Sequence, residues 1–137
     1  MTGAIWLLAA VVATAVVAWA LSKKNGSFSH REDAEMLTVE QIGTTLGERA
    51  TLVQFSSSFC SPCRATRVLL NDLITKVHGV AYVDIDAEAH LALVRELHIM
   101  RTPTVLVLDK NGVIVERASG LPRRVDVIAA LGRAIPE

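Results

Sequence analysis

Cysteine is scarce in this chain of 137 residues, which has only two, Cys60 and Cys63. Two cysteines this close together cannot cross-link distant parts of the chain, so the sequence excludes a small domain held together by disulfides. A structural zinc ion would need further ligands at regular spacing, and the histidines are scattered through the chain at His30, His78, His90 and His98. The sequence therefore predicts no metal site.

An excess of charge is also absent, because 14 Lys and Arg residues balance 14 Asp and Glu residues. Binding to nucleic acid usually needs a basic excess, so we expect no nucleic-acid partner. Internal repeats and low-complexity segments are missing as well. A chain of this length without such features predicts one domain of ordinary size.

Charged side chains are missing altogether from Gly3 to Leu21. An apolar stretch of this length can cross a bilayer as a helix, which needs about 17–25 residues. Trp6 and Trp19 lie near its two ends, where indole rings favour the membrane–water interface. We therefore predict that residues 1–21 form a transmembrane signal-anchor.

A cleaved signal peptide is the alternative, and the small-x-small pattern from Ala18 to Ala20 would suit cleavage. No Lys or Arg precedes the apolar run, however, and the run is long for a signal peptide, so we favour the anchor. Lys23 and Lys24 follow at once, and Arg31 follows a little later. The positive-inside tendency then predicts a single-pass membrane protein with a cytoplasmic domain. An extracytoplasmic or secreted domain is the alternative.

Residues 22–35 are polar and predict a linker, and residues 36–137 predict a globular domain. Apolar periodicity, a capping box from Thr38 to Gln41 and an Asn-Gly turn after Asp109 divide the domain into helices and strands. We expect helices at 38–46, 60–77, 87–98 and 123–134, and strands at 51–55, 80–85, 104–108 and 113–118. Gly47 and Gly79 are expected to end the first two helices.

This order of elements predicts an α/β fold. Strands that alternate with helices pair in parallel through crossovers, and the final hairpin adds antiparallel strands. We therefore expect a central mixed β-sheet flanked by helices. The side chains that the helices are expected to turn inward are Leu69, Leu70, Leu73 and Val77, then Leu91, Val94 and Leu97, and finally Val125, Ile128 and Leu131.

The two cysteines follow a strand and begin a helix, a context typical of a reversible dithiol–disulfide pair. Unpaired backbone N–H groups and the positive end of the helix dipole favour the thiolate form of Cys60. Pro62 falls in the first turn, where a missing N–H has little effect. Cys60 would attack a substrate disulfide, and Cys63 would then attack Cys60 and release the reduced substrate.

Several motifs resemble those of the thioredoxin family. FCSPC at 59–63 is similar to the family's Trp-Cys-Gly-Pro-Cys active site, and RTPT at 101–104 is similar to its cis-proline loop. DKNG at 109–112 and SG at 119–120 are similar to the terminal hairpin and the glycine that follows it. The resemblance covers about residues 36–135, and the order and spacing of the motifs make it specific.

The resemblance implies a thioredoxin-like fold in which Cys60 is the nucleophile and Cys63 the resolving cysteine. It also implies a cis bond between Thr102 and Pro103, beside the sulfurs, and pairing of the backbone around Thr102 with an extended substrate. Gly120 would leave room for that substrate. The substrate-binding residues implied in this way are Phe59, Ser61, Pro62, Thr102, Pro103 and Gly120.

Four positions depart from the family pattern. Gln54 stands where the family usually has a buried Asp that helps to deprotonate the resolving thiol, and an amide cannot titrate. Tyr82 stands where the family often has a Lys coupled to that Asp. Phe59 replaces Trp and is expected to keep the apolar cover of the site, while Ser61 replaces Gly. These changes leave the speed and direction of exchange open.

We interpret the chain as a membrane-tethered thiol–disulfide oxidoreductase of the protein-disulfide reductase type, which contributes to redox homeostasis. It would use no cofactor beyond the Cys60–Cys63 disulfide and would act as a monomer on protein disulfides and thiols. An upstream reductase would supply its electrons, and residues 3–21 would hold it in the membrane. The alternatives are an extracytoplasmic thiol oxidase or substrate-specific thiol donor, and a thioredoxin-like binding module with little catalysis.

Overall fold

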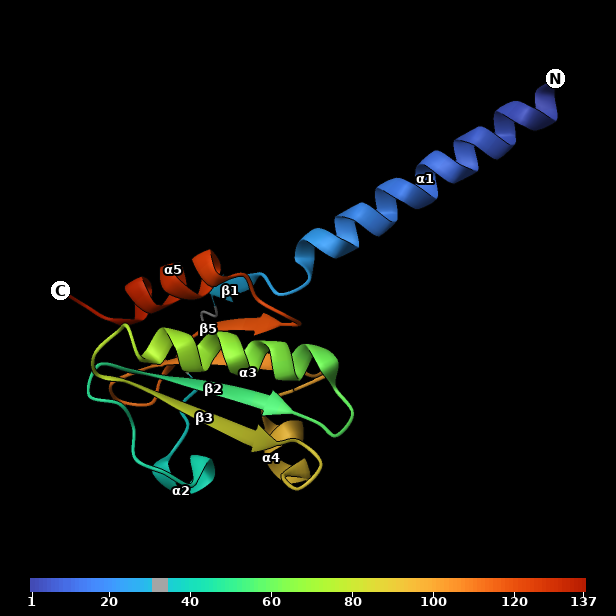
Figure 1. Cartoon of the computed structure of the whole chain (residues 1–137). Coiled ribbons are helices and arrows are strands. Elements are labelled where there is room, and N and C mark those ends of the chain that lie inside the picture. The colour runs from blue at the N-terminus through green and yellow to red at the C-terminus, as the bar shows by residue number, and fades with distance from the viewer. Residues whose placement is uncertain (31–34) are drawn as a thin grey trace.

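A five-stranded mixed sheet forms the centre of the domain in this computed structural model, which describes residues 1–30 and 35–137 (Figure 1). The strands lie in the order β1-β5-β4-β2-β3, and β2 pairs with β3 in parallel while the other neighbours are antiparallel. The strands are β1 (Phe28–His30), β2 (Ala50–Ser56), β3 (Val80–Asp86), β4 (Thr104–Asp109) and β5 (Ile114–Ser119). The helices are α1 (Thr2–Lys24), α2 (Val39–Ile42), α3 (Ser61–Ile74), α4 (Leu91–Glu96) and α5 (Arg124–Ala134).

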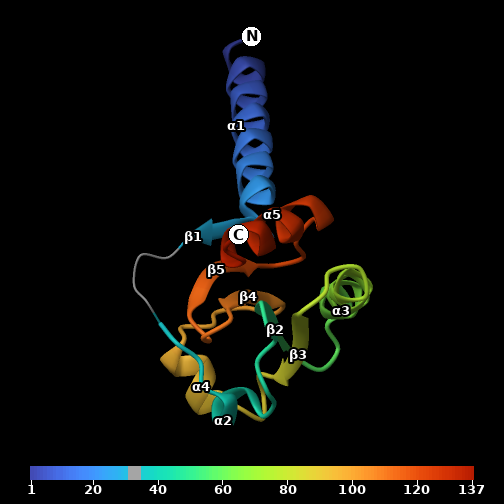
Figure 2. The same ribbon diagram turned by 90° about the vertical axis from the view of Figure 1, so that its left-hand side faces the viewer.

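Helices cover both faces of the sheet, as Figures 1 and 2 show. Side chains of α3 and α5 pack on one face in a core that includes Leu52 of β2, and side chains of α2 and α4 pack on the other face with Val53 and Phe55. The predicted mixed sheet flanked by helices is therefore confirmed. Because side chains alternate along a strand, Gln54 points to the same face as Leu52, toward α3.

The helix α1 extends away from the domain and has no buried residue (Figure 1). It contains 23 residues and continues to Lys24, beyond the predicted end at Leu21. At a rise of about 1.5 Å per residue it is about 35 Å long, enough to cross a hydrocarbon core of about 30 Å. By length and composition α1 is a candidate membrane span.

The segment predicted as a linker contains the short strand β1, which was not predicted. Phe28 of β1 pairs with Ala118 of β5, and its ring packs against the core under α5. A strand of three residues with one apolar side chain is too short to show periodicity, so its sequence gave no signal. Residues 31–34 of the predicted linker, which include the basic Arg31, lie outside the described residues.

The capping box that begins α2 is confirmed. The Thr38 hydroxyl accepts from the backbone N–H of Gln41, and the Gln41 side chain accepts from the N–H of Thr38. The predicted end at Gly47 is wrong, because Gly43 adopts a left-handed conformation with φ 73° and donates to Val39 O at 2.9 Å. Glycine suits this conformation, so the helix ends one turn after it begins.

Predicted ends and inward faces of the other helices also need correction. The helix α3 ends at Ile74, not Val77, so Gly79 lies in the turn that follows. The helix α4 begins at Leu91 rather than residue 87, because the Asp86 carboxylate accepts from the N–H of Glu88 at 2.9 Å and holds a turn there. Leu91 is exposed and Leu93 is buried in its place.

The predicted inward face of α5 is wrong for two of its three residues. Val125 and Ile128 are 63% and 49% exposed, whereas Val127, Ala130 and Leu131 are buried. Apolar residues lie on both sides of this helix, so periodicity alone does not choose a face. We attribute the orientation of α5 to the small side chain of Ala130, which allows close approach of the helix to the sheet.

Candidate active site

The two cysteines lie where β2 gives way to α3. Cys60 is the N-cap residue of α3, and the N–H of Cys63 donates to its Sγ at 3.2 Å. A disulfide joins the two residues, whose Cα atoms are 5.2 Å apart. Cys60 is partly exposed, whereas Cys63 is 1% exposed. Solvent therefore reaches the first cysteine and not the second.

The electrostatic surroundings of Cys60 favour a negative charge on its sulfur. The first turn of α3 contains no acidic residue, and its unpaired N–H groups point toward the N-cap. Arg64 adds a positive charge in the same turn, and its guanidinium donates to Ser61 Oγ at 3.2 Å. These groups stabilise the thiolate that thiol–disulfide exchange requires.

The loop before β4 lies against the cysteine pair. The peptide bond between Thr102 and Pro103 is cis, as predicted. The Thr102 hydroxyl lies 3.9 Å from Cys60 Sγ and 2.7 Å from Ser57 Oγ. Among the described residues, the backbone N–H and C=O of Thr102 make no hydrogen bond. These two groups are available to an extended peptide laid beside the disulfide.

Phe59 does not cover the site as expected. It is fully exposed, and its backbone has a φ of 57°, in the left-handed region. This conformation turns the ring away from the domain, so the Phe59 ring does not cover Cys60. Ser61 and Pro62 are also exposed. The structure thus brings these three predicted residues to the surface around Cys60.

The space beside Gly120 is already filled. Its N–H donates to Pro103 O at 2.7 Å, which ties it to the cis-proline loop, and its φ is 95°. A Cβ atom added at this position would overlap with the side-chain oxygen of Asn25. The same oxygen accepts from the Arg101 guanidinium at 2.7 Å. The room predicted for substrate at Gly120 is therefore occupied by the residue that follows α1.

Gln54 lies buried beneath the first turn of α3. Its amide nitrogen donates to Cys63 O and to Ser56 Oγ, both at 2.9 Å. Its amide oxygen accepts from the Tyr82 hydroxyl at 2.7 Å. The two departures from the family pattern, Gln54 and Tyr82, thus form a hydrogen-bonded pair of neutral groups where the pattern expects a charged one.

The hydrogen bonds of Gln54 and Tyr82 form a network that continues through Ser56 to a charged pair, Asp84 and Arg67. Ser56 Oγ donates to one oxygen of Asp84 at 2.6 Å, and Arg67 binds the other oxygen through two nitrogens at 2.8 and 2.6 Å. Because the carboxylate only accepts, Ser56 must donate to it and accept from Gln54. The direction of every hydrogen bond up to Tyr82 is then fixed.

The same surroundings shift the pKa values of two groups in this network, Tyr82 and Arg67. Burial, and then the negative charge of Asp84, raises the pKa of Tyr82 to about 12. The hydrogen bond and charge of Asp84 also raise the pKa of Arg67. Sequence reasoning missed Ser56, Asp84 and Arg67. The first two could have been found from the strand alternation, since they lie two residues after Gln54 and Tyr82 on neighbouring strands.

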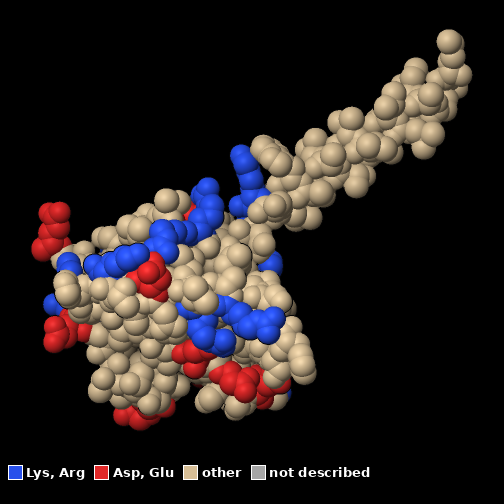
Figure 3. Space-filling view, in the orientation of Figure 1, with Lys and Arg blue, Asp and Glu red and all other residues tan. Residues whose placement is uncertain are grey.

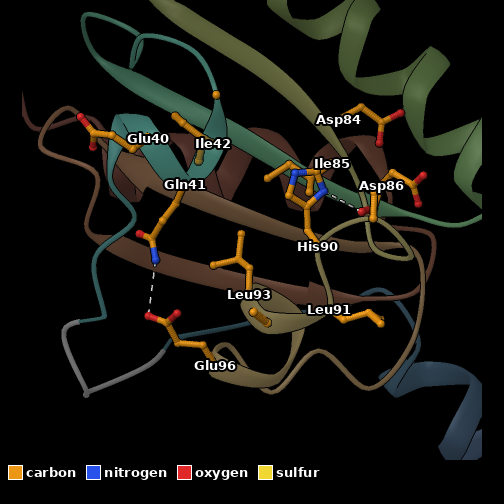
Figure 4. A pocket seen from close by; sticks show the side chains of 13 residues that line it. Glu40, Gln41, Ile42, Asp84, Ile85, Asp86, His90, Leu91, Leu93 and Glu96 are labelled. Carbon is orange, nitrogen blue, oxygen red and sulfur yellow. Dashed lines mark hydrogen bonds between the residues drawn. The ribbon is translucent and has the colours of Figure 1, made fainter.

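A hollow of about 740 Å³ lies between α2, α4 and the end of β3 (Figure 4). Acidic side chains and His90 surround it, and Gln41 donates to Glu96 across it at 3.4 Å. Neither cysteine lines this hollow. Among residues 1–30 and 35–137, no three His, Cys, Asp or Glu side chains are grouped to hold a metal ion. The cysteine pair is thus the candidate site for chemistry.

Comparison with known proteins identifies a family. The family model described as Thioredoxin matches residues 35–132. The chain is 34% identical over 91 residues to mitochondrial thioredoxin of Bos taurus, covering 64% of this chain and 53% of that protein. It is 32% identical over 84 residues to thioredoxin domain-containing protein 2 of Homo sapiens, covering 61% of this chain and 15% of that protein. The chain thus spans about half, or less, of these relatives.

Solved structures agree on the fold. A mutant thioredoxin from Halobacterium salinarum superimposes with a TM-score of 0.62 at 18% identity, over 74% of this chain and 88% of that one. Mitochondrial thioredoxin 3 from Saccharomyces cerevisiae, in its oxidized form, gives a TM-score of 0.55 at 19% identity, over 63% of this chain and 79% of that one. At these identities the likeness concerns the fold alone.

Proposed function

The chain belongs to the thioredoxin family, whose model matches residues 35–132, and we propose that it is a membrane-anchored protein-disulfide reductase. Membership of this family and the close spacing of Cys60 and Cys63 support thiol–disulfide oxidoreductase chemistry in general. One observation carries the proposal. A partly exposed Cys60 caps α3, is joined to the buried Cys63, and lies beside Thr102, whose backbone groups have no partner among the described residues.

The proposed reaction begins with the reduced pair. The Cys60 thiolate attacks one sulfur of a substrate disulfide, whose S–S bond breaks, and the other substrate sulfur leaves as a thiolate and takes up a proton. Cys63 loses its proton and attacks Cys60, and the second substrate thiolate leaves and is protonated in turn. The substrate gains two electrons and two protons, and the domain is left with the Cys60–Cys63 disulfide. A dithiol of an upstream reductase restores the reduced pair by the reverse exchange.

Recognition of the substrate rests on the surface around Cys60. An extended peptide would pair with the N–H and C=O of Thr102, next to Pro103, as an added strand does. The exposed Phe59, Ser61 and Pro62 would contact the side chains of that peptide. Gly120 would add little to this surface, because Asn25 fills the space beside it.

The resolving step would proceed without a buried base. The amide of Gln54 cannot accept the Cys63 proton, and Tyr82, with a pKa of about 12, stays protonated at neutral pH. The proton would therefore pass to solvent or to the departing substrate thiolate. We expect the resolving step to accelerate with pH according to ionisation of Cys63 itself.

The cellular setting is part of the proposal. The helix α1 would hold the protein in a membrane as a monomer, and Lys23 and Lys24 at its C-terminal end favour a cytoplasmic domain. There the protein would contribute to redox homeostasis. A cleaved signal sequence is the alternative for α1. A membrane-impermeant thiol reagent, applied to intact and to lysed cells under reducing conditions, distinguishes a cytoplasmic from an extracytoplasmic domain. Labelling only after lysis supports the cytoplasmic assignment, and labelling of intact cells contradicts it.

Activity is tested with the full-length protein in detergent. We expect it to reduce a protein disulfide with a chemical dithiol as electron source, and the Cys60→Ser, Cys63→Ser double variant to lose this activity. Ser58→Ala serves as a control, because Ser58 lies in the same loop and faces Glu88. Full activity of the double variant would overturn the proposal.

A further inference from the structure

The segment that leaves α1 attaches directly to the candidate active site. Asn25 is the C-cap residue of α1, and its side-chain oxygen accepts from Arg101 and lies against Gly120. The next residue, Gly26, is buried and donates to Ser119 O at 2.7 Å. A Cβ atom on Gly26 would overlap with the carbonyl oxygen of Leu121, so only glycine fits there. No flexible spacer therefore separates α1 from the domain.

The attachment involves the same loops that surround the cysteines. Arg101, which binds Asn25, directly precedes Thr102, and Thr102 lies 3.9 Å from Cys60 Sγ. Gly120, which Asn25 contacts, donates to Pro103 O. The strand β1 then begins at Phe28 and adds to the edge of the sheet beside β5. One residue thus connects the end of α1 to the cis-proline loop.

The position of the membrane surface can be placed relative to this attachment. Trp19 and Lys23 lie near the end of α1, with the Lys23 ammonium 4.2 Å from the centre of the Trp19 ring. Indole rings of this kind lie at the membrane–water interface. Asn25 follows Trp19 by six residues, which is about 9 Å along a helix. The headgroup layer is about 5–8 Å deep. With α1 across a bilayer, as proposed, Asn25 would lie at the outer edge of that layer.

The end of the domain that carries the cysteines is the end that faces α1. In Figure 1, β2 ends and α3 begins on the side of the domain toward which α1 extends. The helix α2 and the C-terminus lie at the opposite end. Basic side chains gather where α1 meets the domain (Figure 3), and Lys23 and Arg123 line a hollow there with Asn25. These cations suit the phosphate groups of a bilayer surface.

Three apolar side chains on the loops of this end are exposed to solvent. Phe59 is fully exposed, Met100 is 90% exposed and Leu121 is 42% exposed. Each lies next to a residue of the candidate site: Cys60, Arg101 or Gly120. Side chains of this kind can contact apolar residues of a partner that emerges from the bilayer.

We infer that the docked Asn25–Gly26 segment holds the redox site toward the membrane, so that its substrates are disulfides of membrane proteins within about ten residues of the bilayer. This inference rests on the proposed function, because it concerns the substrates of the same cysteine pair. A chain of ten extended residues spans at most about 36 Å, which defines the zone within reach. Disulfides held farther from the surface meet the site rarely, since the domain cannot turn to face them.

The test uses the full-length protein in lipid vesicles together with a transmembrane helix that carries a two-cysteine hairpin. In the near substrate the hairpin follows the helix after five residues, and in the far substrate a helical spacer of thirty residues separates them, or about 45 Å. We expect the near disulfide to be reduced at least tenfold faster. Equal rates for the two substrates would overturn the inference.

A variant tests whether the preference for the near disulfide comes from the fixed attachment of the domain to α1 or from the reactivity of the cysteines. A Gly/Ser insertion of twelve residues between Lys24 and Asn25 leaves Asn25 and Gly26 on the domain but frees the domain from α1, with a typical reach of about 20 Å. The preference for the near disulfide should fall below threefold in this variant, and an unchanged preference would count against the inference. A small soluble disulfide should be reduced equally by both proteins. If neither protein reduces it, the proposed function itself is wrong.

Discussion

The hydroxyl of Tyr82 donates a hydrogen bond of 2.7 Å to the amide oxygen of Gln54, beneath the turn that holds Cys63. The register of β2 and β3 makes this contact possible, because Tyr82 lies opposite Leu52, two residues from Gln54 on the same face. The pair supports the carbonyl of Cys63 without adding a charge. The redox turn is thus positioned by neutral groups, and the solvent-exposed ion pair of Asp84 with Arg67 lies one hydroxyl further away.

The coupling of Gln54 and Tyr82 can be measured by a double-mutant cycle. Replacing the amide in Gln54→Met should lower the free energy of unfolding by about 1–3 kcal/mol, because buried polar partners lose their hydrogen bonds. Tyr82→Phe should have a smaller effect. In urea unfolding the two changes should be non-additive by about 1 kcal/mol. Additive effects would show that the hydroxyl and the amide do not interact.

Tyr82 is the only tyrosine in the chain, so its ionisation can be followed by absorbance at 295 nm. In the folded protein the phenol should ionise at a pKa of about 12, raised by burial and then by Asp84. In urea the value should return to about 10. The stability that this group contributes is therefore complete below pH 10 and is lost as the pH rises through 12. Titration of the folded protein near pH 10 would contradict the half-buried position of the Tyr82 hydroxyl.

Thr102→Val tests the hydroxyl that lies beside Cys60. Its loss removes the donor 3.9 Å from Cys60 Sγ and the partner of Ser57 Oγ, so a smaller fraction of Cys60 should be thiolate at neutral pH. The rate of alkylation of the reduced protein at pH 7 should fall by about two- to tenfold. Thr75→Val is the matched control, because that hydroxyl binds Asp72 O at the far end of α3. Equal rates for wild type and Thr102→Val would show that the contact has no influence on the thiolate.

Arg133 and Arg123 form ion pairs of different burial. The Glu116 carboxylate is 2% exposed and is bound by Arg133 at 2.6 Å, with His30 at 3.8 Å. Arg133→Met leaves this buried charge without its main partner and should lower the free energy of unfolding by about 3 kcal/mol. Arg123→Met, which breaks an exposed pair with Asp126, should change it far less. Thermal unfolding of the two variants side by side gives the comparison, and equal losses would contradict it.

Much of the fold was predictable because its strands have strong local signals. The apolar run from Thr51 to Phe55 and the run from Thr104 to Leu108 form β2 and β4, two of the three inner strands of the sheet. Their β-branched residues suit a strand buried on both faces. The capping box at Thr38 was equally predictable, because it depends on two residues of one turn. Features that depend on neighbours within a few residues are visible in the sequence.

The contacts that shape the site were less predictable because they join distant residues. The resemblance placed Gln54 and Tyr82 at two coupled positions of the family pattern, but the hydrogen bond between the hydroxyl and the amide is seen only in the structure. Asn25 and Gly120 are 95 positions apart, and no local pattern relates them. Phe59 was assigned to cover the site from its type, whereas its backbone conformation turns it outward. Residue type alone does not give the direction of a side chain on a loop.

The central claim is that Cys60 attacks the substrate and Cys63 resolves the mixed disulfide. The most direct measurement is trapping of that intermediate with the full-length protein, analysed by non-reducing electrophoresis and mass spectrometry. Cys63→Ser should accumulate a covalent complex in which Cys60 is joined to a substrate cysteine, and a dithiol should release it. Cys60→Ser should form no such complex, because the remaining thiol is 1% exposed in the oxidised protein. Trapping through Cys63, or equal trapping by both variants, would contradict the account.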